Sequence, residues 1–262
     1  MNLLTTVSSA DSKSFRVKRL PCLLLIALFA APAVRAQTAD EVVAKYVAAL
    51  GGKEKVQSIQ SVYQEGTAVM QNGMEIESKT WKVQGKLYRT EISFGTGSVV
   101  VIITPDKGWS SNPRDGGAFK EMTPAQVKNL QWQLDCAGPL VDYGAKGNKV
   151  ELTGSDTVNG SDCYALKLTL PSGEYIKYSI DKKTGYELQE TRQGGGMSRN
   201  AGAGGGPGNG ELKFEYSDYQ KTPDGYTFPF TIVAGSFHAK NSVTKVDVNK
   251  PVDTAALSKP SN

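Results

Sequence analysis

Residues 98–113 read Ser-Val-Val-Val-Ile-Ile-Thr-Pro-Asp-Lys-Gly-Trp-Ser-Ser-Asn-Pro, and this stretch decides the fold. Val99–Ile103 is an unbroken run of β-branched residues, too short for a helix and bounded by Gly97 and Pro105. A short apolar run between turn residues predicts a strand that is buried on both faces. The Pro-Asp-Lys-Gly segment that follows predicts a tight turn. A return strand then begins at Trp109.

The segments on either side of this run alternate between apolar and polar residues, which predicts strands with one buried face. In residues 87–94, for example, Tyr88, Thr90, Ile92 and Phe94 share one face. The predicted strands are 62–70, 74–83, 87–94, 99–103, 109–111, 150–152, 164–170, 175–180, 186–190, 212–219, 226–233 and 243–248. We therefore expect a mainly β protein built as a meander of about 11–12 strands.

Two helices are predicted beside these strands. Thr38 and Glu41 form a capping box before an apolar stripe that ends at Gly51-Gly52. Thr123 and Gln126 repeat this pattern with Pro124 at the first helical position. The stripe of the second helix is Val127, Leu130 and Leu134, and the helix ends near Cys136. Because this helix separates two groups of strands, we expect it to lie across a sheet face.

Residues 1–36 have the pattern of a secretory signal. A basic segment at 13–19 precedes an apolar run from Leu20 to Val34, and the small residue Ala36 follows. We predict cleavage after Ala36, export to the periplasm and a single mature domain at 37–262; the alternative is a retained N-terminal anchor. The predicted signal alone carries five basic groups and one acidic group, which equals the whole chain's net charge of +4. The mature part is therefore near neutral, which argues against nucleic acid as a partner.

Several chemistries are disfavoured by the sequence. His238 is the single histidine, so a multi-histidine metal site is excluded. Residues 194–210 are rich in glycine, but no Gly-Lys-Ser/Thr follows, so we interpret them as a flexible loop rather than a phosphate loop. The acidic residues are scattered and form no recognisable pair. We expect no enzymatic activity and no cofactor.

Two cysteines, Cys136 and Cys163, remain in the predicted mature chain. An oxidising compartment permits a disulfide between them, which would tie the end of the second helix to a strand. The alternative is two buried thiols that act as small hydrophobic residues.

Aromatic and aliphatic side chains on the strands are the main candidates for a binding surface. They form either an ordinary core or, together with the second helix, an apolar ligand cavity. The candidate residues are Ile92, Phe94, Val100, Ile102, Val127, Leu130, Leu134, Leu166, Leu168, Ile176, Phe214, Phe228 and Phe230.

Several different short motifs are distributed along the predicted mature chain. They are Leu50-Gly51-Gly52-Lys53-Glu54-Lys55, Trp81, Thr104 to Asp106 with Gly108, Trp109, Asn112 and Pro113, Gly138-Pro139-Leu140-Val141-Asp142-Tyr143, Asp162-Cys163-Tyr164, Tyr216-Ser217-Asp218-Tyr219 and Phe228-Pro229-Phe230. In these motifs and in the order of elements the chain resembles the LolA/LolB family of periplasmic lipoprotein carriers. It also resembles proteins named outer membrane lipoprotein-sorting protein.

The resemblance implies an incomplete antiparallel β-barrel whose concave apolar face binds acyl chains beneath a lid that includes the helix after Pro124. It also implies lipoprotein sorting by a monomer, with an inner-membrane donor and an outer-membrane acceptor. The family's Arg-Pro pair, whose arginine helps to hold the lid, is replaced here by Gln84-Gly85. The alternative is a non-catalytic envelope interaction protein with a filled core and no lipid cargo.

Overall fold

The computed structural model describes residues 37–70, 73–95, 97–193, 211–234 and 239–260. The chain divides into two units, 1–36 and 37–262, and every described residue belongs to the second unit. The predicted signal segment, the glycine-rich segment 194–210 and His238 lie outside the described residues.

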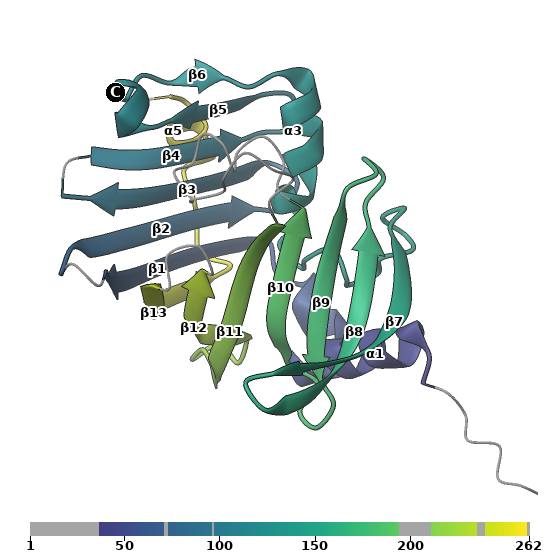
Figure 1. The fold of residues 1–262 in the computed structure, drawn as a ribbon. Helices are drawn as coiled ribbons and strands as arrows, with labels where there is room; N and C mark the ends of the chain where they lie inside the picture. The colour runs from purple at the N-terminus through teal and green to yellow at the C-terminus, as the bar shows by residue number, and fades with distance from the viewer. Residues whose placement is uncertain (1–36, 71–72, 96, 194–210, 235–238, 261–262) are drawn as a thin grey trace, which may run out of the picture. The chain divides into compact units, whose positions relative to one another are not determined.

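Thirteen antiparallel strands form one sheet in the described part of the chain, in the order β6-β5-β4-β3-β2-β1-β13-β12-β11-β10-β9-β8-β7. Their bounds are β1 Ser61–Val69, β2 Glu75–Val83, β3 Leu87–Phe94, β4 Gly97–Ile103, β5 Gly108–Ser111, β6 Lys120–Glu121, β7 Lys149–Val158, β8 Ser161–Thr169, β9 Tyr175–Asp181, β10 Glu187–Gln193, β11 Glu211–Lys221, β12 Thr227–Ala234 and β13 Ala239–Val248. The edge strands β6 and β7 lie at opposite ends of the sheet (Figure 1). The sheet is therefore an open meander, consistent with an incomplete barrel. The additional strand is β6, two residues long, which the sequence pattern did not predict.

Strand β4 is buried on both faces, as its sequence predicts. Val99 to Ile103 are all buried, and Ile102 and Ile103 are fully buried. Val101 and Ile103 pack against Val127 and the residues around it. We call this side of the sheet, which all the longer helices cover, the helix face, and the opposite side the outer face.

The helix face is covered by three segments. Helix α1 (Ala39–Ala49) packs on β8 and β9, and the short helix α2 (Lys53–Gln57) packs on β1, β12 and β13. The third segment is α3 (Pro124–Leu130) followed by the 3-10 helix η2 (Gln131–Leu134), which pack on β3 and β4. Both predicted capping boxes are present, at Thr38 and at Thr123. The second predicted helix is thus shorter than expected and ends in a tighter 3-10 turn.

The outer face of β3–β5 is covered by the C-terminal segment, which includes helix α5 (Thr254–Leu257). Leu257 packs against the cluster formed by Leu87, Val100 and Ile102. Arg89 fixes the segment, because one of its guanidinium nitrogens (Nη1) donates to the carbonyl oxygens of Leu257 at 3.0 Å and of Lys259 at 3.4 Å. A segment without sequence periodicity therefore covers the second face of the central sheet.

Candidate functional site

The apolar residues Val99–Ile103 of β4 are distributed between the two faces of the sheet in a different way from the one that the sequence predicted. Val100 and Ile102, predicted to face the second helix, pack instead with Leu257 on the outer face. Val101 and Ile103 take the helix-side positions. Neighbouring residues of a strand point to opposite faces, so in a uniformly apolar run the pattern does not identify the inner set. The placement of Val100 and Ile102 beside α3 was therefore wrong.

Other predicted site residues form ordinary core beneath α1. Leu166, Leu168 and Ile176 are almost completely buried and pack against Val42 and Val43 of that helix. On the opposite half of the helix face, Val127 and Leu134 are buried against β3 and β4, with Leu130 beside them. These residues fill the two ends of the helix face rather than line a free surface.

Between these ends lies a row of side chains that stay only half-buried. The strand register places Ile92 and Phe94 on the helix face, opposite Val99 and Gly97 of β4. Phe228 packs at the edge of the cluster beneath α2, and Phe230 follows on the same face. We call the following half-buried residues on this face the central strip: Thr80, Lys82, Tyr88, Thr90, Ile92, Phe94, Phe214, Tyr216, Phe228, Phe230 and Ile232.

The α3–η2 segment connects the two halves of the sheet over this strip. Asn129 donates to Glu174, in the turn between β8 and β9, at 2.7 Å. Gln131 donates to the carbonyl oxygens of Thr104 and Pro105, in the turn between β4 and β5, at 3.2 and 3.0 Å. Trp132 packs against the cluster beneath α1, whereas Leu134 packs against β3 and β4. The segment therefore occupies the position that the sequence predicted for a lid.

The turn Gln84-Gly85, which stands where the carriers that the sequence resembles have Arg-Pro, also holds this segment. The backbone N–H of Cys136 donates to Gln84 Oε1 at 2.7 Å, and the N–H of Gly85 donates to the carbonyl oxygen of Leu134 at 2.9 Å. An arginine also contacts the α3–η2 segment: it is Arg192 of β10, whose guanidinium lies 4.8 Å from the centre of the Trp132 ring. The segment is thus anchored on both sides.

Charged groups cluster on the helix face beside the central strip. Glu187 and Glu190 of β10 are buried, and Glu190 forms an ion pair with Nε of Arg192. Lys82 of β2 lies across from them, and burial followed by the charge of Arg192 lowers its pKa. Among the described residues, Glu187 Oε1 and the hydroxyl of Tyr178 are buried without a hydrogen-bond partner. Burial and the charge of Glu190 raise the pKa of Glu187 well above its ordinary value.

Sequence reasoning missed this charged cluster. Strand β10 reads Glu-Leu-Gln-Glu-Thr-Arg-Gln and has polar residues on both faces. Its pattern therefore does not show which face points toward the helices. A break in register between Glu187 and Gln189 also brings Glu187 onto the same face as Glu190. The weak signal that existed was the charged pair Glu190 and Arg192, spaced two apart, of which only Glu190 lies in the predicted strand 186–190.

The two cysteines do not form the predicted disulfide, because both are free thiols. Cys163 is fully buried in β8, and its neighbour Tyr164 packs on the helix face, so Cys163 points to the outer face. Cys136 lies at the end of η2 beside Gln84, on the helix face. The two side chains therefore lie on opposite sides of the sheet. Burial raises the pKa of Cys136 to about 11.

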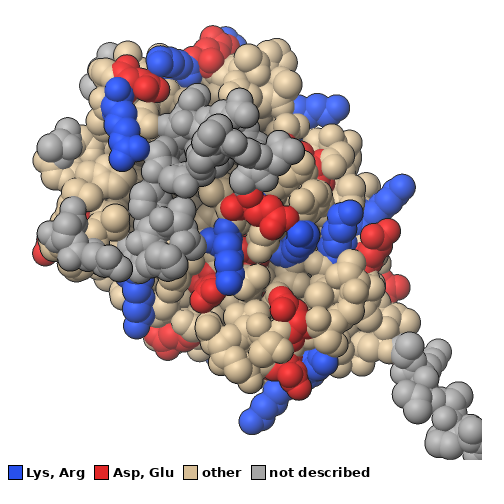
Figure 2. Space-filling model, viewed as in Figure 1, with Lys and Arg blue, Asp and Glu red and all other residues tan. Residues whose placement is uncertain are grey.

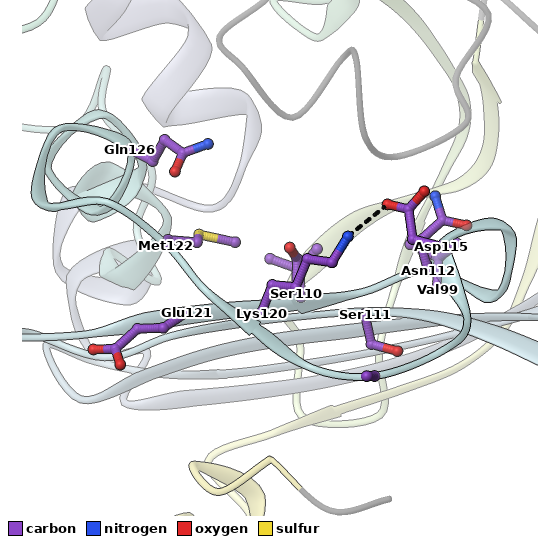
Figure 3. A pocket seen from close by; sticks show the side chains of 11 residues that line it. Val99, Ser110, Ser111, Asn112, Asp115, Lys120, Glu121, Met122 and Gln126 are labelled. Carbon is purple, nitrogen blue, oxygen red and sulfur yellow. Dashed lines mark ion pairs between the residues drawn. The ribbon is translucent and has the colours of Figure 1, made fainter.

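A small pocket lies at the sheet edge between β4, β5, β6 and α3 (Figure 3). Its volume is about 160 Å³, and its walls include Val99, Val101 and Met122. An ion pair between Lys120 and Asp115, 3.5 Å apart, stands at its rim. Small-molecule sites usually measure roughly 300–1,000 Å³, so this pocket admits a single small group rather than an acyl chain.

A larger open groove of about 510 Å³ lies along α1, beside residues 141–145. Its lining is mainly apolar and small, including Val43, Ala44 and Val47. Tyr143 closes one end by a hydrogen bond to Asp40, and Lys53 pairs with Asp142. The sequence predicted a cavity between the sheet and the helix after Pro124. This groove lies outside that space.

The described surface mixes charges of both signs. Basic and acidic side chains are interspersed on the face in Figure 2, and the pair Lys177–Glu211, 2.7 Å apart, connects β9 and β11 across β10. In the part of the chain that the structure describes, no cluster of three or more His, Cys, Asp or Glu residues is arranged to hold a metal ion. The helices of that part are all too short or too polar to cross a membrane.

Comparisons with known proteins give the following similarities. No family model and no curated protein matches the sequence. Among solved structures, the chain is similar to a DUF1329 family protein from Desulfovibrio piger, with 13% identity over 84% of this chain and 96% of that one and a TM-score of 0.48. It is also similar to a LolA superfamily protein from Nitrosomonas europaea, with 11% identity, coverage of 86% and 99%, and a TM-score of 0.48.

A third similar structure is titled an outer membrane lipoprotein-sorting protein domain, from Vibrio parahaemolyticus. It is 12% identical over 84% of this chain and 97% of that chain, with a TM-score of 0.46. The last two proteins carry the names of the group that the sequence motifs resemble.

Proposed function

We propose that this protein is an exported carrier that binds the acyl chains of a lipid or lipoprotein on the helix face of its sheet. The central strip is the main support for this proposal. Ile92, Phe94, Phe228 and Phe230 remain half-buried, although the ends of the same face are sealed by α1 and α3–η2. An acyl chain lying on these side chains gains roughly 0.8 kcal/mol for each CH₂ that it buries.

The α3–η2 segment suits the role of a lid. Side-chain and backbone hydrogen bonds to three turns hold it, together with the packing of Val127 and Leu134 on β3 and β4, rather than membership of the sheet. Breaking a few such bonds costs about 1 kcal/mol each, because water replaces the lost partners, and exposing each of the two apolar side chains costs about 1.5–3 kcal/mol. The segment can therefore move without disrupting the strand ladder beneath it.

The exported state is part of the proposal. The capping box of Thr38 begins α1 directly after the predicted cut at Ala36, so cleavage leaves the folded unit 37–262 intact. A periplasmic monomer that takes cargo from an inner-membrane donor and delivers it to an outer-membrane acceptor fits this organisation. N-terminal sequencing of exported protein checks the cut, and the expected first residue is Gln37.

Lipid binding is tested with delipidated protein and a fluorescent fatty acid. Ile92→Gln places an amide on the central strip and should weaken binding tenfold or more, because burying an isoleucine side chain contributes about 1.5–3 kcal/mol. Ser93→Gln is the matched control: Ser93 is the next residue of β3, is also half-buried and points to the outer face. We expect the control to bind as the wild type does.

Two results would overturn the carrier proposal. The first is wild-type protein that binds no probe after delipidation and carries no lipid in native mass spectrometry when freshly purified. The second is equal loss of binding in the two variants, which would place the ligand elsewhere, for example in the groove along α1. The first result favours the alternative, a non-catalytic envelope interaction protein with a filled core.

A further inference from the structure

The ammonium group of Lys82 lies on the helix face without an ion-pair partner among the described residues. In β2 its side chain projects between Val62 of β1 and Tyr88 of β3, both of which pack toward the helices. The ring of Tyr88 lies beside it, 5.6 Å from Nζ to the ring centre. No described carboxylate forms an ion pair or a hydrogen bond with it. A half-buried ammonium normally has such a partner.

Arg192 presents further unused donors to the same region. Its Nε is paired with Glu190, while the rings of Trp132 and Phe214 hold the guanidinium plane at 4.8 and 4.7 Å. Its two Nη groups make no hydrogen bond with the described residues, and 27% of the side-chain surface remains accessible to solvent. A guanidinium fixed in this way is prepared to donate two parallel hydrogen bonds to an oxyanion.

The two cations flank η2 and belong to one electrostatic cluster: Arg192 lies against the ring of Trp132, and Lys82 lies beside Tyr88, which packs with Leu134. The charge of Arg192 contributes, after burial, to lowering the pKa of Lys82, and the raised pKa of Glu187 favours its neutral form. Glu190 is already paired with Arg192. Asp135, at the end of η2, is already paired with Lys146 at 2.5 Å. A bound anion would supply the partner that Lys82 lacks among the described residues.

We propose that Lys82 and Arg192 bind the anionic head group, a carboxylate or a phosphate, of an amphiphile whose acyl chain lies on the central strip. This inference rests on the proposed lipid-binding function and specifies its ligand class. Tyr88 and Tyr216 belong to the strip and flank the two cations, while Ile92, Phe94 and Phe230 continue it as an apolar surface. A polar end and an apolar end on one face match the two ends of a single-chain anionic lipid.

Isothermal titration of the delipidated protein separates the head-group contribution from the chain contribution. Palmitic acid and hexadecanol share one chain length and differ in charge. We expect the acid to bind at least tenfold more tightly than the alcohol. Hexadecyl phosphate tests whether phosphate replaces carboxylate, and inorganic phosphate alone tests whether a free anion suffices. Binding of inorganic phosphate as tight as that of hexadecyl phosphate would overturn the amphiphile assignment.

Lys82→Gln should reduce the preference for palmitate over hexadecanol severalfold, with Arg192 supplying what remains, and leave hexadecanol binding unchanged, whereas Lys82→Arg should retain the full preference for the acid. The matched control is Lys79→Gln, on the same strand but on the outer face, opposite Glu65 and Glu91. Equal binding of acid and alcohol by the wild type, or an unchanged ratio in Lys82→Gln, would refute the head-group assignment and leave the carrier proposal standing. If neither ligand binds, the carrier proposal fails as well.

Discussion

The buried carboxyl of Glu187 makes a quantitative prediction about stability and pH. In the folded protein Glu187 is almost fully buried beside Glu190, and both burial and that neighbouring charge raise its pKa well above the ordinary value of 4.5. Arg192 acts in the opposite direction but is paired with Glu190. Tyr46 of α1 and Tyr178 of β9 belong to the same electrostatic cluster.

The sign of the effect follows from proton counting. In the unfolded chain Glu187 releases its proton near pH 4.5, whereas the folded chain retains it to a higher pH. Between these two pKa values the folded state binds more protons than the unfolded state, so the free energy of unfolding decreases as the pH rises. One proton corresponds to about 1.4 kcal/mol per pH unit. Glu187 therefore contributes most below pH 4.5, and this contribution is lost as the pH rises through the folded-state pKa.

Replacement of Glu187 by Gln should remove this pH dependence while keeping a neutral group of similar shape. Urea unfolding at pH 5.5, 6.5 and 7.5, followed by tryptophan fluorescence, measures the free energy of unfolding at each pH. We expect the wild type to lose up to about 3 kcal/mol more than Glu187→Gln over this interval. Glu75→Gln, at an exposed position of β2, is the control and should keep the wild-type slope. Parallel slopes for the wild type and Glu187→Gln would refute the reasoning.

Two further predictions concern the lid and the thiols. Trp132→Leu removes the ring that lies over Arg192, and we expect it to destabilise the protein by about 1–2 kcal/mol and to speed hydrogen exchange in residues 124–136. Unchanged exchange in that segment would mean that the contact does not hold the lid. Cys136 has a pKa of about 11 and Cys163 is fully buried, so iodoacetamide at pH 8 should modify neither thiol in folded 37–262 and both after unfolding. A mass consistent with a disulfide, or rapid modification of the folded protein, would contradict this.

Much of the sheet could be predicted because its signals are local. Period-two alternation placed Tyr88, Thr90, Ile92 and Phe94 on one face of β3, and the register with β4 confirms this. The capping boxes at Thr38 and Thr123 mark both helix starts, because they involve residues only three positions apart. The very short strand β6 was not predicted, because two exposed residues are too few to show an alternation of apolar and polar side chains.

The candidate site could be predicted only in part. Ile92, Phe94, Phe214, Phe228 and Phe230 lie on the helix face, and their role in ligand binding stays a prediction. Leu166, Leu168 and Ile176 also lie on that face, but as core beneath α1. Gln84-Gly85 stands where the carriers that the sequence resembles have Arg-Pro, and Gln84 and Arg192 contact the α3–η2 segment in a way that no local pattern could indicate.

The sequence by itself determined the elements: a doubly buried β4, a meander of strands and two capped helices, because each depends on propensity and spacing within a few residues. Only the tertiary structure decided which half of the β4 run faces inward, since an apolar residue at every position satisfies both faces equally. It also decided that Lys82 and Arg192, from strands far apart in the sheet order, belong to one cluster. Their proximity depends on how the sheet wraps around η2, and that curvature is a property of the packed molecule rather than of any segment.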